Sequence, residues 1–485
     1  MLTPVRVRGR RTRQKPKRQS SDDDPGESPS SQDSQSSTKS KRRARLKPFD
    51  QLIDYQEKTL AHRKALLAAA AAAPKRKKRA GLSLLERLPV ELIEKIFLYS
   101  LELNLPRASA RIGAAVSNSR VYRELILLAF YGEEDGPVRE PECRAAISKA
   151  FRLAEYGPLG ERERTRLQAA VLNCRWCTRD RIQAQLPELM RMMVFQQWFD
   201  RRIGMSGEEK SELERLLSRN AVQRSGTDGY TFEGTSTDQH VYLTIVPLVS
   251  VTYATDFERK TYGVLSLRSL PGRLLRGGND GFRPDDLDLL EIFRVQAGLQ
   301  HPRRLNTPLL EYSREALQEG IHNALVSRNE RALTILLKLD EMLVRSHVTE
   351  TGELPYSLPA EHFRTAVHHS PDDPRFFQLL LRAHAESVPP DDPDITQWAM
   401  DLQSSPAQGS RALGGWLLDF MVELTADVVE RARKDPQRAA LFYQGGINLE
   451  HKMGRSYAEL AGGTRSLSRW MHETDYDVSR QWIPA

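Results

Sequence analysis

The chain has 485 residues, of which 39% are hydrophobic, so it is long enough for two or three folded domains. Its formal net charge of +8 is unevenly distributed: through residue 80 there are 22 Lys and Arg against 8 Asp and Glu, and afterwards 50 against 56. This distribution predicts a basic tail on a mildly acidic body and argues against a body that binds nucleic acid. Three cysteines, Cys143, Cys174 and Cys177, are too few for a disulfide framework, which is typical of a reducing compartment.

The N-terminal tail carries the basic charge. Residues 1–48 combine low hydrophobicity with dense charge, which predicts disorder, and 49–80 predict a helix followed by a basic linker. The Lys/Arg clusters at 6–18, 41–47 and 75–79 are typical of nuclear import signals, and the alternative is contact with nucleic-acid phosphates. Because no aromatic residue lies among them, base stacking is not supported. We expect a protein of the nucleus, with the cytoplasm as an alternative, that binds a nuclear import receptor; nucleic acid is the less favoured partner.

No segment predicts a membrane partner. The longest apolar run, at 65–73, falls well short of the roughly 20 residues that cross a bilayer. The first 20 residues lack both the apolar core of a secretory signal and the apolar stripe of a mitochondrial transit helix.

Residues 81–131 predict a small module of three helices. Pro89 suits the first turn of a helix, where its missing N–H leaves no hydrogen bond unmade. The helix that follows has more apolar surface than its own module can bury, so we expect one side of it to contact a partner. Asn118 or Ser117 is the expected N-cap of the third helix. The first helix has a face of Leu85, Leu88, Leu92, Ile96 and Tyr99 and a second strip of Ile93 and Phe97, and the third has an inner face of Val121, Tyr122, Leu125 and Leu128.

Residues 141–485 predict a mostly helical body with a small antiparallel sheet. The pattern is helical over 141–225, where Ser206 and Glu209 have the spacing of a capping box. The stretch 226–300 is rich in Val, Thr, Tyr and Ile and predicts two or three strands before it returns to helix.

Residues 311–485 are again predicted to be helical and contain a weak internal repeat. The segment 320–339 resembles 361–386, with Ala324 and Ala366 at equivalent places. This pattern is typical of paired helices of the ankyrin or HEAT type, and an ordinary all-helical domain is the alternative. The predicted fold class is therefore mainly α with a small β region, behind a disordered tail.

Neither a cofactor nor a metal site is predicted. Cys174 and Cys177 have the spacing of a zinc or redox pair, but no second pair completes four metal ligands and the surrounding pattern is helical, so we expect two half-buried thiols. Four histidines lack acidic or thiol partners at metal spacing and fit the surface of paired helices. A polar set in the strand region is the weak alternative for an enzyme. The histidines are His362, His368, His369 and His384, and the polar set is Asp228, Asp238, His240 and Asp256.

The stretch 88–117 contains a set of short motifs at fixed places: Leu88-Pro89-x-Glu91-Leu92, Ile96-Phe97, Leu105-Pro106-Arg107 and Arg111-x-Gly113-Ala114-Ala115-Val116-Ser117. Together they resemble an F-box motif of the kind common in filamentous-fungal F-box proteins, and LNCRW at 172–176 is similar to a segment seen after the F-box in such proteins. The generic Val-Cys-x-x-Trp end of the motif is absent and is replaced by residues 116–122.

The resemblance implies a three-helix module that docks on the Skp adaptor and through it on a cullin. The chain would then be the non-catalytic substrate receptor of an SCF-type ubiquitin ligase, and residues 141–485 would hold a protein substrate that the sequence does not identify. The alternative is a nuclear scaffold whose basic tail binds nucleic acid. The residues expected to contact the adaptor are Leu88, Pro89, Leu92, Ile93, Ile96, Phe97, Leu105 and Pro106.

Overall fold

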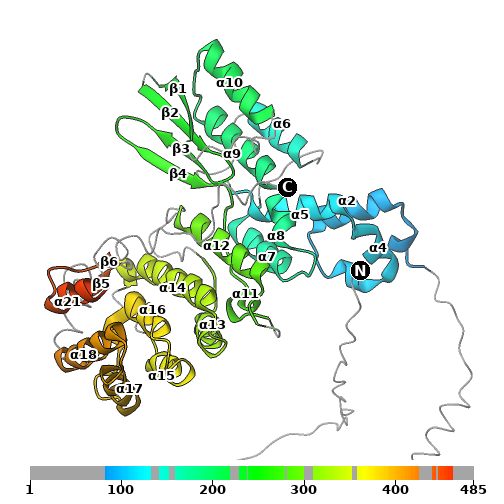
Figure 1. Ribbon diagram of the computed structural model, residues 1–485. Coiled ribbons are helices and arrows are strands. Elements are labelled where there is room, and N and C mark those ends of the chain that lie inside the picture. The colour runs from blue at the N-terminus through cyan, green and yellow to red at the C-terminus, as the bar shows by residue number, and fades with distance from the viewer. Residues whose placement is uncertain are drawn as a thin grey trace, which may run out of the picture. The chain divides into compact units, whose positions relative to one another are not determined.

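The protein is mostly helical and contains a four-stranded antiparallel sheet, which confirms the coarse fold class (Figure 1). The chain divides into two compact units, Met1–Pro89 and Val90–Ala485. The predictions for 1–48 and 49–80 lie outside the described residues. The computed structural model describes residues 82–132, 141–151, 159–218, 229–237, 239–278, 281–299, 310–351, 358–424, 440–443 and 446–461.

In the first unit, the described residues form one short 3-10 helix, η1 (Leu85–Arg87). The Ser83 N–H donates to the Glu86 carboxylate at 2.7 Å, and the Glu86 N–H donates to the Ser83 hydroxyl at 3.3 Å. Leu88 is extended, with φ −68° and ψ 151°, because a following proline disfavours the helical conformation. The predicted apolar face is therefore interrupted, and the longer helix begins only at Val90.

The second unit opens with four helices, of which α2 packs against α4 and α5. The Asn118 side chain accepts a hydrogen bond from the Val121 N–H at 3.0 Å, so Asn118, and not Ser117, caps α5. Its amide group also donates to the Glu94 carboxylate at 2.6 Å, which ties the start of α5 to α2. The helices are α2 (Val90–Ser100), α3 (Leu105–Ala108), α4 (Ala110–Val116) and α5 (Ser119–Phe130).

Five helices follow, as predicted for residues 141–225 where these are described. The Glu209 N–H donates to the Ser206 hydroxyl at 3.2 Å, which confirms Ser206 as a cap. The helices are α6 (Pro141–Ala150), α7 (Glu161–Leu172), α8 (Arg179–Gln183), α9 (Leu186–Asp200) and α10 (Gly207–Ser218).

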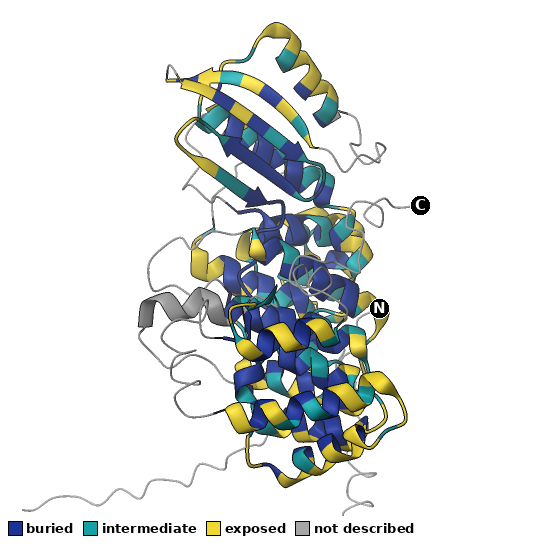
Figure 2. Ribbon diagram, turned by 60° about the vertical axis from the view of Figure 1, so that its left-hand side comes forward, coloured by how far each residue is buried: buried dark blue, intermediate teal, exposed yellow. Residues whose placement is uncertain are grey.

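The sheet has four strands rather than two or three, joined in sequence order as an antiparallel meander. Buried and exposed residues alternate along β2, and its buried residues are Val241, Leu243 and Ile245 (Figure 2). On the opposite face, one threonine from each strand stands in the same cross-strand row. The strands are β1 (Tyr230–Ser236), β2 (Gln239–Val246), β3 (Ser250–Ala254) and β4 (Arg259–Gly263).

The remaining helices stack in pairs (Figure 1). In one layer α13 contacts α11 and α15, and α15 contacts α17; in the other, α14 contacts α12 and α16. Ala324 and Ala366, the equivalent places of the predicted repeat, are buried in α13 and α15, and Ala399 is buried in α17. The elements are α11 (Gly272–Arg276), α12 (Pro284–Gly298), α13 (Arg314–Val326), α14 (Glu330–Thr351), α15 (Ala360–His369), α16 (Arg375–His384), η3 (Ala385–Ser387), α17 (Pro393–Gln403), α18 (Gln408–Glu423), β5 (Phe442–Tyr443), β6 (Gly446–Ile447) and α21 (Lys452–Leu460).

Candidate docking surface

Helix α2 leaves an apolar stripe in contact with solvent. Leu92, Ile96 and Tyr99, which we call the apolar stripe, are 46%, 40% and 55% exposed. Their spacing of four and three residues places them on one face of the helix. Half of the large apolar residues that are exposed in the described part of the chain lie within residues 82–99. Full burial of such a side chain stabilises by about 1.5–3 kcal/mol relative to full exposure. A partner that covers this face would therefore lower the free energy of the complex.

The opposite face of α2 belongs to the core of the unit. Ile93 and Phe97 are only 1% and 2% exposed, and Leu98 is also buried. The expectation that Ile93 and Phe97 contact a partner therefore needs correction: they are buried where α2 packs on α4 and α5. The sequence offered two apolar strips, and either one could have faced inward.

The remaining residues expected at the docking surface differ in their surroundings. Leu105 and Pro106 lie half-buried on α3. Gly113 of α4 allows α3 to approach closely, because a Cβ atom at Gly113 would lie 2.8 Å from the Pro106 carbonyl oxygen. In the other unit, Leu88 is half-buried and Pro89 is exposed.

An aromatic stack holds the LNCRW segment against α5. The rings of Tyr122 and Trp176 lie 4.3 Å apart at an interplanar angle of 14°. On α8, the Arg181 guanidinium lies 4.7 Å from the centre of the Tyr122 ring. By its spacing, Tyr122 was expected on the inner face of its helix, and Trp176 stood out only as part of the LNCRW resemblance. No local pattern signalled that these residues, 54 positions apart, meet.

Of the Cys174/Cys177 pair, Cys174 is half-buried as expected, whereas Cys177 is buried. Burial raises the pKa of both thiols, and that of Cys177 reaches about 12, so both are protonated at neutral pH. In the described part of the chain, no three His, Cys, Asp or Glu residues are placed to hold a metal ion.

The four histidines and the polar set do not form a common site. His362 is buried and contacts Gln318 at 2.7 Å, whereas His368 contacts Asp394 and His384 contacts Ser387. His369 is exposed at the end of α15. His240 and Asp256 are exposed, and Asp228 and Asp238 lie outside the described residues.

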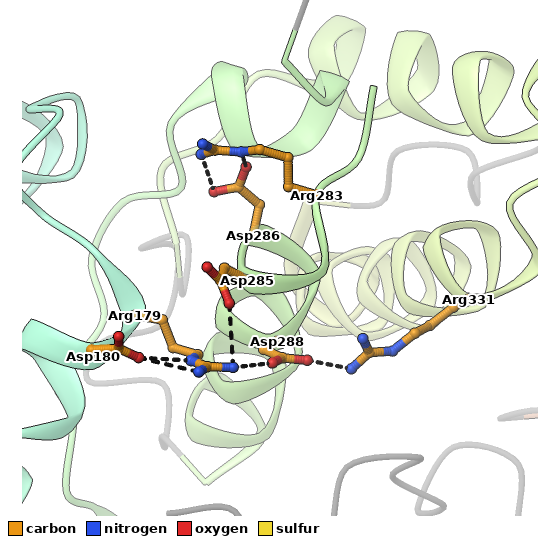
Figure 3. Close-up of polar contacts among 7 residues, drawn as sticks. All are labelled: Arg179, Asp180, Arg283, Asp285, Asp286, Asp288 and Arg331. Carbon is orange, nitrogen blue, oxygen red and sulfur yellow. Dashed lines mark hydrogen bonds and ion pairs between the residues drawn. The ribbon is translucent and has the colours of Figure 1, made fainter. Parts of the chain in front are cut away.

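A buried carboxylate links α8 with the paired helices (Figure 3). Asp288 of α12 accepts a hydrogen bond from Arg179 of α8, and another from Arg331 of α14 at 2.6 Å. Asp285 adds a weaker ion pair to Arg179 at 3.4 Å, and Asp286 pairs with Arg283 through two hydrogen bonds at 2.8 and 3.1 Å. Because each charge has a partner within the chain, we assign this cluster a structural role: it connects α8, α12 and α14.

The comparisons with known proteins give no match: no family model, no curated protein and no solved structure matches this chain. Among the helices of the described segments, none has the length and apolar character needed to cross a membrane.

Proposed function

We propose that this protein is the substrate receptor of an SCF-type ubiquitin ligase, and that it docks on the Skp adaptor through the apolar stripe of α2. The observation that carries the proposal is the exposure of Leu92, Ile96 and Tyr99 on the face of α2 opposite to its buried face. A helix of this kind, laid in the apolar groove of a partner, is a recurrent mode of recognition. The resemblance of 88–117 to an F-box motif is the reason for proposing the Skp adaptor as that partner.

The proposed role needs no catalytic residue in this chain. A receptor raises the effective concentration of its substrate near the transferring enzyme, so the chemistry takes place on other subunits. The paired helices α13–α18 are the proposed substrate-binding part, because stacked helix pairs form extended surfaces that suit protein recognition. The basic clusters of the tail direct the proposed receptor to the nucleus.

Adaptor binding by the full chain tests the proposal. The change Leu92→Ala with Ile96→Ala removes two central anchors and should weaken binding to a purified Skp adaptor by about 100-fold or more. Its thermal unfolding should stay close to that of the wild type, because both side chains are substantially exposed. Val422→Ala, at an equally apolar and more exposed site on α18, is the matched control and should bind normally.

A second variant, at a buried position of α2, shows how a loss of stability differs from a loss of adaptor binding. Ile93→Ala empties a buried position on the other face of α2 and should lower the free energy of unfolding by about 2–4 kcal/mol. If the chain does not bind the adaptor, or if the Leu92/Ile96 variant binds as well as the wild type, the docking proposal is wrong. The nuclear scaffold alternative would instead show binding to nucleic acid that falls steeply with salt.

A further inference from the structure

An exposed aromatic residue stands at the tip of the β3–β4 hairpin. Phe257 is 87% exposed, the largest exposed fraction among the large apolar residues of the described chain. The turn that carries it is held by hydrogen bonds: the Thr255 N–H donates to the Glu258 carbonyl at 2.7 Å. The Thr255 hydroxyl also accepts from the N–H groups of Phe257 and Glu258 at 3.3 and 3.1 Å. A well-ordered turn that exposes a phenylalanine to water suggests that this side chain is an anchor that binds in a pocket of another molecule.

The same sheet adjoins a hollow that suits such an anchor. It measures about 700 Å³ and lies between α6, α9, α10 and the segment that joins α9 to α10. Its walls are mainly apolar and aromatic, and the two charged residues among them are both cations. Lys210 lies 5.8 Å from the centre of the Trp198 ring. The residues that line it are Pro141, Trp198, Phe199, Arg202, Ile203, Gly204, Met205 and Lys210.

The anchor and the hollow are complementary in charge as well as in polarity. Asp256 places a carboxylate directly beside Phe257, while the carboxylate of Glu258 is paired with Lys260 at 2.5 Å. A phenylalanine flanked by an acidic side chain fits an aromatic hollow that has the exposed Lys210 in its wall.

The hairpin cannot reach the hollow of its own chain. Gly204, in the wall of the hollow, pairs with Thr235 of β1, whereas Phe257 follows β3 and precedes β4 at the far edge of the sheet. Three strand spacings separate the two edges, roughly 14 Å. In an antiparallel meander, however, the β1–β2 and β3–β4 turns lie at the same end of the sheet. Anchor and hollow are therefore both accessible to a second molecule that approaches this end.

We propose that the protein self-associates, with Phe257 of one copy inserted into the hollow beside Trp198 and Lys210 of a second copy. A two-fold axis would relate two such contacts, so that each copy both inserts its Phe257 and accepts the Phe257 of the other. Two-fold symmetry is the usual symmetry of a homodimer. Because each contact is small, the dimer should be reversible and should form with increasing protein concentration. This inference does not depend on the adaptor proposal.

Sedimentation velocity of the full chain, from low to high micromolar concentration, tests the inference. The wild type should shift reversibly from monomer to dimer, and Phe257→Ala should weaken the association about tenfold or more. Lys210→Glu should weaken it as well, and Asp256→Lys in the same chain should restore it by exchanging the two charges. Val422→Ala, which removes an equally exposed apolar side chain on α18, should leave the association unchanged.

Two results would overturn the inference. One is a wild-type chain that stays monomeric at the highest concentration. The other is a Phe257→Ala variant that associates as tightly as the wild type. All the altered side chains are exposed, and thermal unfolding of each variant would show that the fold is kept.

Discussion

Gln168 of α7 joins three segments of the chain through one side chain. Its amide group donates to the carbonyl oxygens of Ala129 and Ser266, at 3.1 and 2.9 Å. Its amide oxygen accepts from the N–H groups of Arg268 and Ser269, at 2.6 and 2.9 Å. The side chain is fully buried, so all these bonds form away from water, where an unmade bond would cost the most. No sequence pattern predicts this role of Gln168, because its hydrogen-bond partners lie about 40 and 100 residues away.

At the residue scale, Asp288→Asn should lower the free energy of unfolding by about 2 kcal/mol. The change keeps the shape of the side chain but removes the negative charge that Arg179 and Arg331 share in a largely buried position. Asp285→Asn is the control, since its ion pair to Arg179 is long and exposed and should be worth less than about 1 kcal/mol. Urea unfolding of both variants makes the comparison, and equal effects would contradict the assigned role.

His362 makes the stability of the protein depend on pH. Burial, and to a lesser degree the nearby His322, lower the pKa of His362 from 6.5 to about 4. The unfolded chain therefore binds a proton between these values that the folded chain does not. Stability from this residue is complete above pH 6.5, falls as the pH drops to about 4, and then stays constant; the total loss is about 3 kcal/mol.

The measurement is urea unfolding of the wild type and of His362→Gln between about pH 7 and pH 4. The difference between their unfolding free energies should change in this window, because only the wild type has the additional proton uptake. A constant difference would mean that His362 titrates normally in the folded protein.

At the scale of single elements, α2 shows both what an amphipathic pattern predicts and where it is ambiguous. The spacing of apolar residues correctly predicted a helix with two apolar strips. The expected start at Pro89 is right to within one residue, since α2 begins at Val90. The extension of the apolar face back to Leu85 was wrong, because Leu88 precedes a proline and is extended. Which strip faces inward depended on α4 and α5, which pack on α2; Ile93 and Phe97 are buried, and Leu92, Ile96 and Tyr99 stay exposed.

The contact between α11 and α13 depends on a glycine. A Cβ atom at Gly320 would lie 1.9 Å from the carbonyl oxygen of Leu275, so Gly320→Ala should force the helices apart and cost about 3 kcal/mol of stability. Gly409→Ala is the control on α18, where a Cβ atom would meet nothing within 4 Å. There the alanine should be neutral or stabilise by up to about 1 kcal/mol. Thermal unfolding of both variants would reveal the contrast, and equal midpoints would refute it.

At the scale of the whole molecule, α5 connects the predicted docking module with the rest of the second unit. Nearly all of its residues from Val121 onward are buried, and it packs on α7. Phe130 at its end stacks on Phe293 of α12 at 6.0 Å, and the Phe130 carbonyl accepts from the Ser266 N–H at 2.9 Å. The exposed stripe of α2 therefore belongs to the same compact unit as the sheet and the paired helices.

This arrangement predicts that residues 82–132 alone do not fold stably. Isolation would expose the apolar side of α5 that α7 and α12 cover, and short helices without tertiary contacts are marginal in water. Circular dichroism should show little helix in this fragment, whereas a longer piece through Leu299, which keeps α7 and α12, should regain it. A cooperative unfolding transition of the short fragment would show that the module is autonomous.

Local information in the sequence determined the helical class, the cap at Ser206 and the strand region, and it narrowed the cap of α5 to Asn118 or Ser117. These features depend on neighbours a few residues apart, which a sequence displays directly. The tertiary structure alone decided which face of α2 is buried, that Trp176 stacks on Tyr122, that Gln168 joins three segments, and that Phe257 and the hollow beside Trp198 lie at opposite edges of one sheet. Each of these depends on which distant segments come to share a core, and that choice is made by packing over the whole unit rather than by any local pattern.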